Sequence, residues 1–292
     1  MATGSTTTAT LADSLPKWIF KARQVREHEG VMPQLVEKQT LGKGLGLTWH
    51  EVSFAQLTAM SITETTELDN PQQLSDTDLS ITPTVVGIHV RITDRVANRI
   101  SKIALAQTGG LAQNAIQRKK DEDGLTMLDG FSTGNPASGS STLTSGHIAA
   151  GVSRIQGNTT EPGTPPFRCV LHPYQIKDIQ DEIVAGVGTY PVGEGLTARV
   201  FTEGFRGMVA GAQLYADGNI DITTTANEAK GGVFAQAALI LVQGMAPRAV
   251  TVRNEKVGGG ATDIYHYDEY LYGERQDLWG YELYSDATAP TS

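Results

Sequence analysis

The chain has 292 residues, of which 39 % are hydrophobic and 19 % are charged, and its formal net charge is −9. Enough apolar side chains are present to bury a core, which excludes a disordered chain. The negative charge argues against a protein that holds nucleic acid on a basic surface. The 32 glycines and 12 prolines favour a fold rich in strands and loops over a helical bundle.

The single cysteine, Cys169, excludes an intrachain disulfide and a thiolate zinc site. We expect its thiol to be buried and inert. The most apolar stretch, residues 233–242, has about half of the roughly twenty residues that a membrane-spanning helix needs, so no membrane span is predicted.

The chain begins with a polar tail that lacks the charged and apolar regions of a secretory signal. Residues 11–26 then carry apolar side chains at helical spacing, with Lys17 and Lys21 among the basic residues between them. This pattern predicts a short basic amphipathic helix, which we expect to pack against protein rather than lie on a membrane surface.

A long acidic hairpin is predicted next, after a glycine-rich hinge at residues 42–46. The sequence contains no lysine or arginine between Lys43 and Arg91. Residues 82–93 (TPTVVGIHVRIT) carry alternating apolar side chains from Val86 to Ile92, and we interpret them as one of the two strands that flank a polar tip. Such a hairpin cannot bury itself well, so we expect it to project from the body. The acidic residues of the tip are Glu64, Glu67, Asp69, Asp76 and Asp78.

A helix capped by Thr93 or Asp94 is expected to follow the hairpin. Gly109 and Gly110 should weaken or kink it by about 1 kcal/mol each relative to alanine, and the helical spacing stops at Gly124. Beside its apolar face runs a cationic stripe, which is either a solvated helix face or a docking surface for the acidic hairpin. The stripe consists of Arg95, Arg99 and Lys102.

The second half of the chain predicts an α/β layer followed by sheet. Residues 130–146 have the composition of a loop, and a helix (147–156), a strand (167–172) and a helix that begins at Pro173 come after them. Beyond Gly186 the pattern is typical of strands separated by glycines, at residues 196–220, 234–243, 248–254 and 264–286.

The sequence GFSTG around Ser132 matches the G-x-S-x-G pattern of a hydrolase nucleophile elbow. A triad in the usual chain order can be written with Asp178 and His266. However, Pro136 stands where the supporting helix of an elbow would need an N–H group. A serine hydrolase is therefore kept only as an alternative of a different class.

Two further clusters of polar residues have simple structural explanations. His266 and Asp268 could share a metal on one strand face, but two ligands do not make a site, and we interpret them as a half-exposed polar pair. Asp121 and Asp123 stand beside two lysines at a helix end, where a solvated charge cluster explains them. No catalytic residue, cofactor or metal site is assigned, and we expect a protein that is not an enzyme.

The order of these elements resembles that of tailed-bacteriophage major capsid proteins of the Hong Kong 97 type. Three stretches carry the resemblance: residues 124–131 (GLTMLDGF), 167–183 (FRCVLHPYQIKDIQDEI) and 204–220 (GFRGMVAGAQLYADGNI). The resemblance implies an α+β capsid fold. Its parts would be an N-terminal arm at 1–40, an extended hairpin loop with its return strand at 41–92, the spine helix of the peripheral domain at 93–125, an axial α/β domain at about 126–250, and return strands at 251–292.

The resemblance also implies a function. Many copies would self-assemble into pentamers and hexamers that close into an icosahedral shell around double-stranded DNA, in the virion after assembly in the host cytoplasm. Scaffold, portal and decoration proteins are possible partners in that family, and no cross-linking residues can be carried over to this chain. An encapsulin-type shell, which encloses a cargo enzyme, is the alternative within the same fold.

The charge pattern adds a hypothesis about how copies would meet. The acidic tip of one subunit, at Glu64, Glu67 and Asp69, would lie on the cationic stripe of a neighbour or on its basic arm. Each exposed pair contributes only about 0.2–1 kcal/mol, but a closed shell repeats the contact many times. Ser132 is expected to be inert in assembly.

Overall fold

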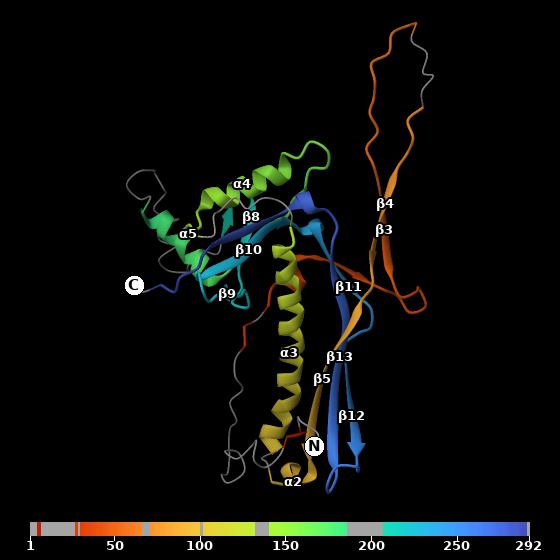
Figure 1. The fold of residues 1–292 in the computed structure, drawn as a ribbon, viewed down its shortest axis with the longest axis vertical. Coiled ribbons are helices and arrows are strands. Elements are labelled where there is room, and N and C mark those ends of the chain that lie inside the picture. Colours follow the sequence, from red (N-terminus) through yellow and green to blue (C-terminus); the bar gives the residue numbers. More distant parts are fainter. Residues whose placement is uncertain are drawn as a thin grey trace.

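One long helix contacts two sheets and organises the molecule (Figure 1). The computed structural model describes residues 5–6, 27–28, 30–65, 71–99, 102–131, 140–185 and 207–290, with only the backbone given for 5–6, 102–108 and 183–185. The long helix, α3, spans Lys102–Asp129. The predicted amphipathic helix at 11–26 lies outside the described residues.

The first sheet has six strands in the order β1-β5-β13-β11-β2, with β12 beside β13. Its central strand β13 is rich in tyrosine, an aromatic residue that favours extended backbone. Because side chains alternate along a strand, one face of β13 points at α3 and the other points away from it. The strands are β1 (Ser5–Thr6), β2 (Glu37–Thr40), β5 (Thr84–Thr93), β11 (Leu239–Gln243), β12 (Arg248–Asn254) and β13 (Ala261–Glu274).

The second sheet also has six strands, in the order β14-β10-β6-β8-β7, with β9 beside β10. One face packs on α4 (Ser145–Gln156) and α5 (Pro173–Ala185), and the opposite face packs on the C-terminal end of α3. Cys169 and Val170 are neighbours on β6 but belong to the two separate cores, as the alternation requires. The strands are β6 (Phe167–Leu171), β7 (Met208–Val209), β8 (Ala212–Ala216), β9 (Ile222–Thr223), β10 (Glu228–Ala235) and β14 (Gly280–Asp286).

The long helix differs from its prediction in both length and continuity. Thr93 precedes only a four-residue helix, α2 (Asp94–Ala97), and the long helix begins at Lys102, so the prediction of one helix that starts at Thr93 or Asp94 is wrong. Helix α3 then runs unbroken to Asp129, because its many alanine, leucine, glutamine and lysine residues offset the cost of about 1 kcal/mol per glycine. The predicted end at Gly124 is wrong. A Cβ at that position would lie 2.8 Å from the Cβ of Met32 and 3.0 Å from the Tyr272 ring, so this glycine permits close packing.

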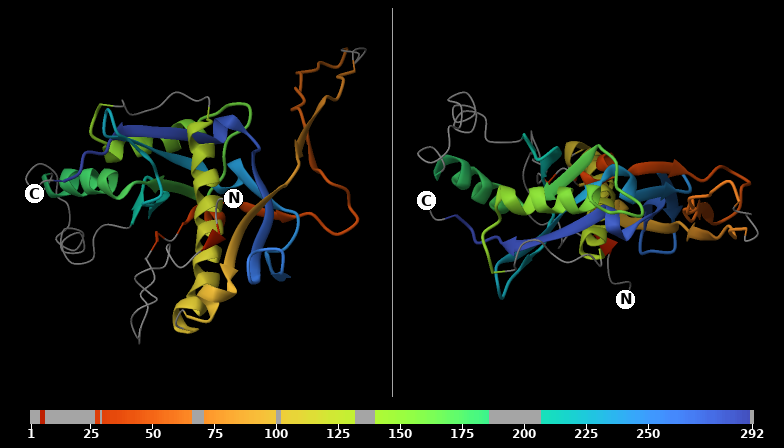
Figure 2. Two further views of the ribbon diagram at one scale, coloured as in Figure 1. Left: turned by 60° about the horizontal axis from the view of Figure 1, so that its bottom comes forward. Right: turned by 90° about the horizontal axis from the view of Figure 1, so that it is seen from above.

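The hairpin exists, but its returning strand is not the predicted one. β3 (Trp49–Phe54) pairs antiparallel with β4 (Asp76–Ile81) in a separate two-stranded sheet. Asp76 and Asp78, predicted in the tip, therefore lie on the returning strand. The strand at 84–93 is β5, which pairs with β13 in the body instead. In all three ribbon views the hairpin stands away from the rest of the chain (Figures 1 and 2).

The predicted helix, strand and helix of the α/β layer are confirmed as α4, β6 and α5. The predicted strand at 234–243 is interrupted at Gln236–Ala238 by a turn of 3-10 helix, and β10 and β11 on its two sides belong to different sheets. A second such turn, Asp277–Trp279, separates β13 from β14, and a short helix, α1 (Met32–Leu35), precedes β2. None of the described helices is both long enough and apolar enough to span a bilayer. The thiol of Cys169 is buried, as predicted.

Candidate functional site

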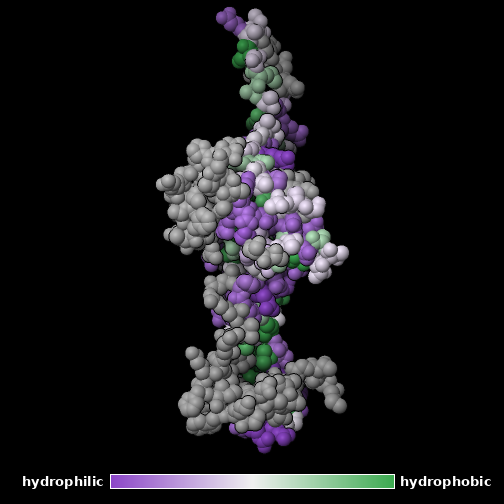
Figure 3. All heavy atoms as spheres, turned by 90° about the vertical axis from the view of Figure 1, so that its left-hand side faces the viewer, coloured by the Kyte–Doolittle hydropathy of each residue, from purple (hydrophilic) through white to green (hydrophobic). Residues whose placement is uncertain are grey.

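The projecting hairpin exposes a series of large apolar side chains. Figure 3 shows them in green among polar residues at the end of the hairpin. Each is between 50 % and 70 % exposed: Val52, Phe54, Leu57, Met60, Ile62 and Leu74. A two-stranded ribbon cannot cover such side chains by itself, and a run of them on one projection marks a surface that contacts another molecule.

The root of the hairpin, in contrast, is fixed to the body. Ile81 is only 3 % exposed and forms a small core with Ile240 and Val242 of β11. On β13, a Cβ at Gly273 would lie 2.2 Å from the Ile81 side chain, so this glycine makes room for it. The hairpin is thus a projection on a rigid base, and beyond the root Gln56 donates to the Thr160 carbonyl in the loop after α4.

A forked ion pair strengthens the same root. The Arg275 guanidinium, at the end of β13, donates to Glu51 on β3 (2.9 Å) and to Glu37 on β2 (2.6 Å). Its side chain is 16 % exposed, so this contact is screened less than a surface pair. Three strands that are far apart in the sequence are held together at the point where the hairpin leaves the body.

The predicted acidic tip and cationic stripe lie far apart within one chain. Glu64 is exposed in the hairpin, while Glu67 and Asp69 lie outside the described residues. Arg95 on α2 and Arg99 just after it are both exposed. Figure 1 shows α2 at the end of the molecule opposite to the hairpin. A contact between these charges therefore requires two copies of the chain.

The structure describes little of the other residues in the predicted contact. Lys102 is the first residue of α3, and its side chain is not described. Lys17 and Lys21 lie outside the described residues. The predicted pairing of the tip with the stripe or with the arm is thus neither supported nor contradicted by distances within the chain.

The charge cluster on α3, predicted to be solvated, is largely buried. Lys120 is 5 % exposed, and its ammonium group donates to Asp268 on β13 at 2.8 Å. Asp121 is fully buried and accepts a hydrogen bond from the backbone of Met32. Only the pair of Lys119 with Asp123 lies at the surface as predicted. The prediction failed because this part of the helix is covered by β13 on one side and by the arm on another.

The polar pair on β13 is also different from its prediction. Asp268 is fully buried, and its oxygens accept from Lys120 and, at 3.4 Å, from Gln243. The Lys120 ammonium group also lies 4.6 Å from the centre of the Tyr270 ring. Within the described parts of the chain, no group of three histidine, cysteine, aspartate or glutamate side chains is placed to hold a metal ion.

The members of the hypothetical triad are not brought together. Asp178 lies on α5, which covers one sheet, and His266 lies on β13 in the other sheet. Ser132 lies outside the described residues. The residues GLTMLD before it belong to the last turns of α3, so the strand that an elbow requires is missing there.

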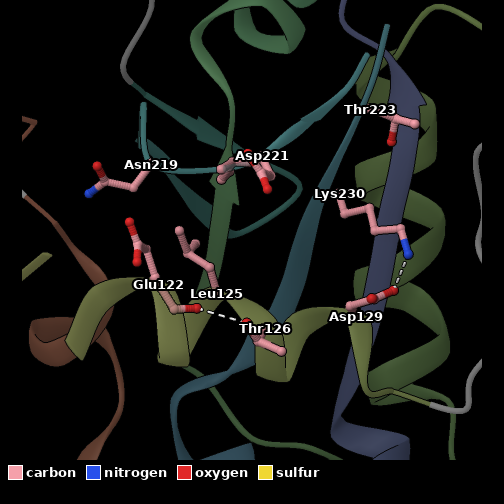
Figure 4. Close-up of a pocket in the computed structure, with 9 residues that line it drawn as sticks. Glu122, Leu125, Thr126, Asp129, Asn219, Asp221, Thr223 and Lys230 are labelled. Carbon is pink, nitrogen blue, oxygen red and sulfur yellow. Dashed lines mark hydrogen bonds and ion pairs between the residues drawn. The ribbon is translucent and has the colours of Figure 1, made fainter. Parts of the chain in front are cut away.

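A groove runs between the C-terminal half of α3 and the turn before β9 (Figure 4). Three carboxylates line it, from Glu122, Asp129 and Asp221, and its lysine, Lys230, is paired with Asp129. Its described lining contains no histidine, cysteine or serine.

No family model matches the chain, and no curated protein matches its sequence. Solved structures do match its fold. The structure of Mycobacterium phage Che8 has a TM-score of 0.72 at 14 % identity, covering 94 % of this chain and 97 % of that one. The capsid asymmetric unit of cyanophage Pam1 has a TM-score of 0.72 at 13 % identity, covering 99 % and 100 %. The chain has the fold of phage capsid proteins.

This capsid fold confirms the α+β class that was predicted from the order of the elements. It is shared with a further structure, the holo-SrpI encapsulin complex from Synechococcus elongatus PCC 7942. That match has a TM-score of 0.62 at 12 % identity and covers 96 % of both chains.

Proposed function

We propose that the chain is the major capsid protein of a tailed bacteriophage, a structural protein without catalytic activity. The observation that supports this most is the extent of the fold match, which includes 99 % of this chain and all of the cyanophage Pam1 subunit. Almost no part of the chain is left over for a second domain. Copies would form pentamers and hexamers of an icosahedral shell around double-stranded DNA, as part of the virion assembled in the host cytoplasm.

The hairpin supplies the main contact between copies in this proposal. Burying one exposed large apolar side chain is worth about 1.5–3 kcal/mol, while an exposed ion pair contributes about 0.2–1 kcal/mol. The apolar series from Val52 to Leu74 therefore provides most of the affinity. The charges of Glu64, Glu67 and Asp69, facing Arg95, Arg99 and Lys102 or the basic arm with Lys17 and Lys21, select the orientation.

The positions of the two surfaces fit a closed ring of subunits. Hairpin and α2 lie at opposite ends of the molecule, so a contact between them joins unlike surfaces of two copies. Contacts of this kind generate a ring when the rotation between copies closes. Pentamers and hexamers are such rings.

The net charge of −9 suits a shell that encloses DNA, because the polymer is repelled by an acidic wall and slides past it. Scaffold, portal and decoration proteins are further partners under the same proposal.

An encapsulin-type shell is the second candidate, favoured by the match to the SrpI complex at lower TM-score. Electron microscopy of the purified protein distinguishes the two shell proposals from the serine hydrolase alternative. We expect rings or closed shells, and a stable 31.2 kDa monomer would contradict the proposal. Particles from infected or lysogenic cells that contain DNA would support the phage head, whereas particles filled with a cargo enzyme would support the encapsulin.

A further inference from the structure

Two buried carboxyl groups meet where the N-terminal arm enters the body. Asp121 lies on α3, and Asp217 lies in the turn after β8. Asp121 accepts hydrogen bonds from the Met32 N–H (2.9 Å) and from the Asn219 side-chain amide (2.9 Å). Asp217 accepts from the Val31 N–H (3.2 Å) and the Asn219 N–H (2.9 Å). The pair connects the arm, the long helix and the turn.

The arm packs closely against α3 and against the turn. A Cβ at Gly30 would lie 2.2 Å from the carboxyl carbon of Asp121. On the turn, a Cβ at Gly218 would lie 2.6 Å from the ring of His28. Because both positions are glycine, the arm approaches Asp121, and the turn approaches His28 of the arm, more closely than other residues would allow.

Both carboxyl groups are buried: Asp121 is 0 % exposed and Asp217 is 1 % exposed. Among the ion pairs of the described residues, none includes either group, although Asp217 lies within hydrogen-bonding reach of Asp121. Two adjacent buried carboxylates repel each other, so such a pair retains one proton. Burial, reinforced by the neighbouring Asp217, raises the pKa of Asp121 to about 7.

The other charged and titratable groups around the pair come from α3, from β13, from the arm and from the residue after β6. On α3, Arg118 pairs with Glu27 of the arm at 3.4 Å, and Lys120 pairs with Asp268. From β13, the Tyr272 hydroxyl faces Asp121, and burial raises its pKa far above neutrality. The arm and the residue after β6 contribute two histidines that interact with each other, His28 and His172.

We propose that Asp121 and Asp217 form a proton-operated latch that fixes the direction in which the N-terminal arm leaves the body. With one proton shared between the carboxyl groups, their oxygens accept hydrogen bonds from the N–H groups of Val31 and Met32. They also accept from the backbone N–H and the side-chain amide of Asn219. When the proton is lost, two negative charges occupy one buried site. Their repulsion weakens the site, and the contact with the arm at Val31 and Met32 loosens with it.

The direction of the pH effect follows from the raised pKa. Between the ordinary pKa of 3.8 and about 7, the closed latch binds a proton that the unfolded chain does not. Its contribution to stability is complete below pH 3.8 and is lost as the pH rises through 7. The arm is therefore held at mildly acidic pH and released in mildly alkaline solution.

Hydrogen exchange on the full-length, unassembled protein tests the latch independently of shell formation. The measured quantity is the protection of the backbone amides at 31–36, corrected for the intrinsic rate, between pH 5.5 and 8.5. In the unaltered protein we expect protection to fall at least tenfold across this range. Asp121→Asn imitates the protonated group, and its protection should be high and independent of pH.

Two control variants distinguish the latch from other titrating groups, and a further variant replaces Asp121→Asn if that protein does not fold. Glu122→Gln removes the next carboxylate on α3 and His28→Gln removes the nearby histidine, and both should retain the pH dependence. Asp217→Asn removes the same repulsion from the other side and serves if Asp121→Asn does not fold. Constant protection in the unaltered protein, or pH dependence that survives both aspartate substitutions or disappears in His28→Gln, would overturn the proposal.

Discussion

The hairpin and the interface between α3 and β13 use the same residue types in opposite ways. On the hairpin, acidic and apolar side chains are exposed together on a ribbon that has no core of its own. Beneath α3, Lys120 and Asp268 are buried together and satisfy each other. The comparison shows that a charge next to apolar residues in the sequence has no fixed meaning. What covers it decides whether it sets the fold of one subunit or the contact between subunits.

The largest effect is expected from breaking the buried ion pair. Lys120→Ala leaves the Asp268 carboxylate buried without its cation, and we expect the free energy of unfolding to fall by about 3–5 kcal/mol. Urea unfolding of the unassembled subunit measures this. Lys119→Ala is the matched control, since it removes an exposed pair one residue away and should cost at most about 0.5 kcal/mol. Equal losses in the two variants would show that the buried pair has no special role.

A smaller effect, on association alone, is expected from the apolar side chains of the hairpin. Phe54 is 70 % exposed in the subunit, so Phe54→Ser should leave the unfolding of the isolated subunit nearly unchanged. If Phe54 is covered by a neighbour, the substitution should weaken each contact by about 1.5–3 kcal/mol. Light scattering during assembly compares the critical concentrations, with Val85→Ser as a control because Val85 is 60 % exposed on the body. Identical assembly of all three proteins would contradict a role for the hairpin.

Reversing the charges should have a still smaller effect per contact. Glu64→Lys with Glu67→Lys is expected to slow or weaken assembly by about 0.2–1 kcal/mol for each pair, and most strongly at low salt. Adding Arg95→Glu and Arg99→Glu should restore it if these residues are the partners. The salt dependence of assembly measures both steps. A first variant without effect, or a second without rescue, would mean that the tip faces other groups.

No effect at all is expected from Ser132→Ala. In the proposed function this side chain has no role in chemistry or in assembly, so the shells of the variant should match those of the unaltered protein in yield and shape by electron microscopy. A loss of esterase activity in this variant would instead support the hydrolase alternative.

The sequence predicted those features that depend on local pattern. Helix α4, strand β6 and helix α5 follow from helical spacing, an apolar run and Pro173 at a helix start. The capsid fold followed from the order of elements rather than from any single motif. The exposure of Glu64 was predicted from its polar stretch, and that of Arg95 and Arg99 from their spacing beside an apolar face.

Most of the errors concern contacts between distant parts of the chain. Residues 82–93 have the alternation of a strand, but β5 pairs with β13, whereas β3 pairs with β4 at 76–81, and alternation alone does not distinguish these partners. Gly124 has the residue type of a helix end, yet Met32 and Tyr272 require a glycine there inside the helix. The exposed apolar side chains of the hairpin were not predicted, because the acidic residues between them led us to interpret this stretch as a polar tip.

The root of the hairpin has a mechanical consequence for a shell. Figure 1 shows the hairpin and β13 extending along the same long axis. A pull from a neighbour would enter the body at Ile81 and Arg275 and pass into β13, which is paired with β5 along residues 261–270. The backbone hydrogen bonds of such a ladder lie perpendicular to the strands, so a force along β13 loads many of them at once. In the proposed shell, tension between subunits would thereby be resisted in shear, and no single bond would have to open first.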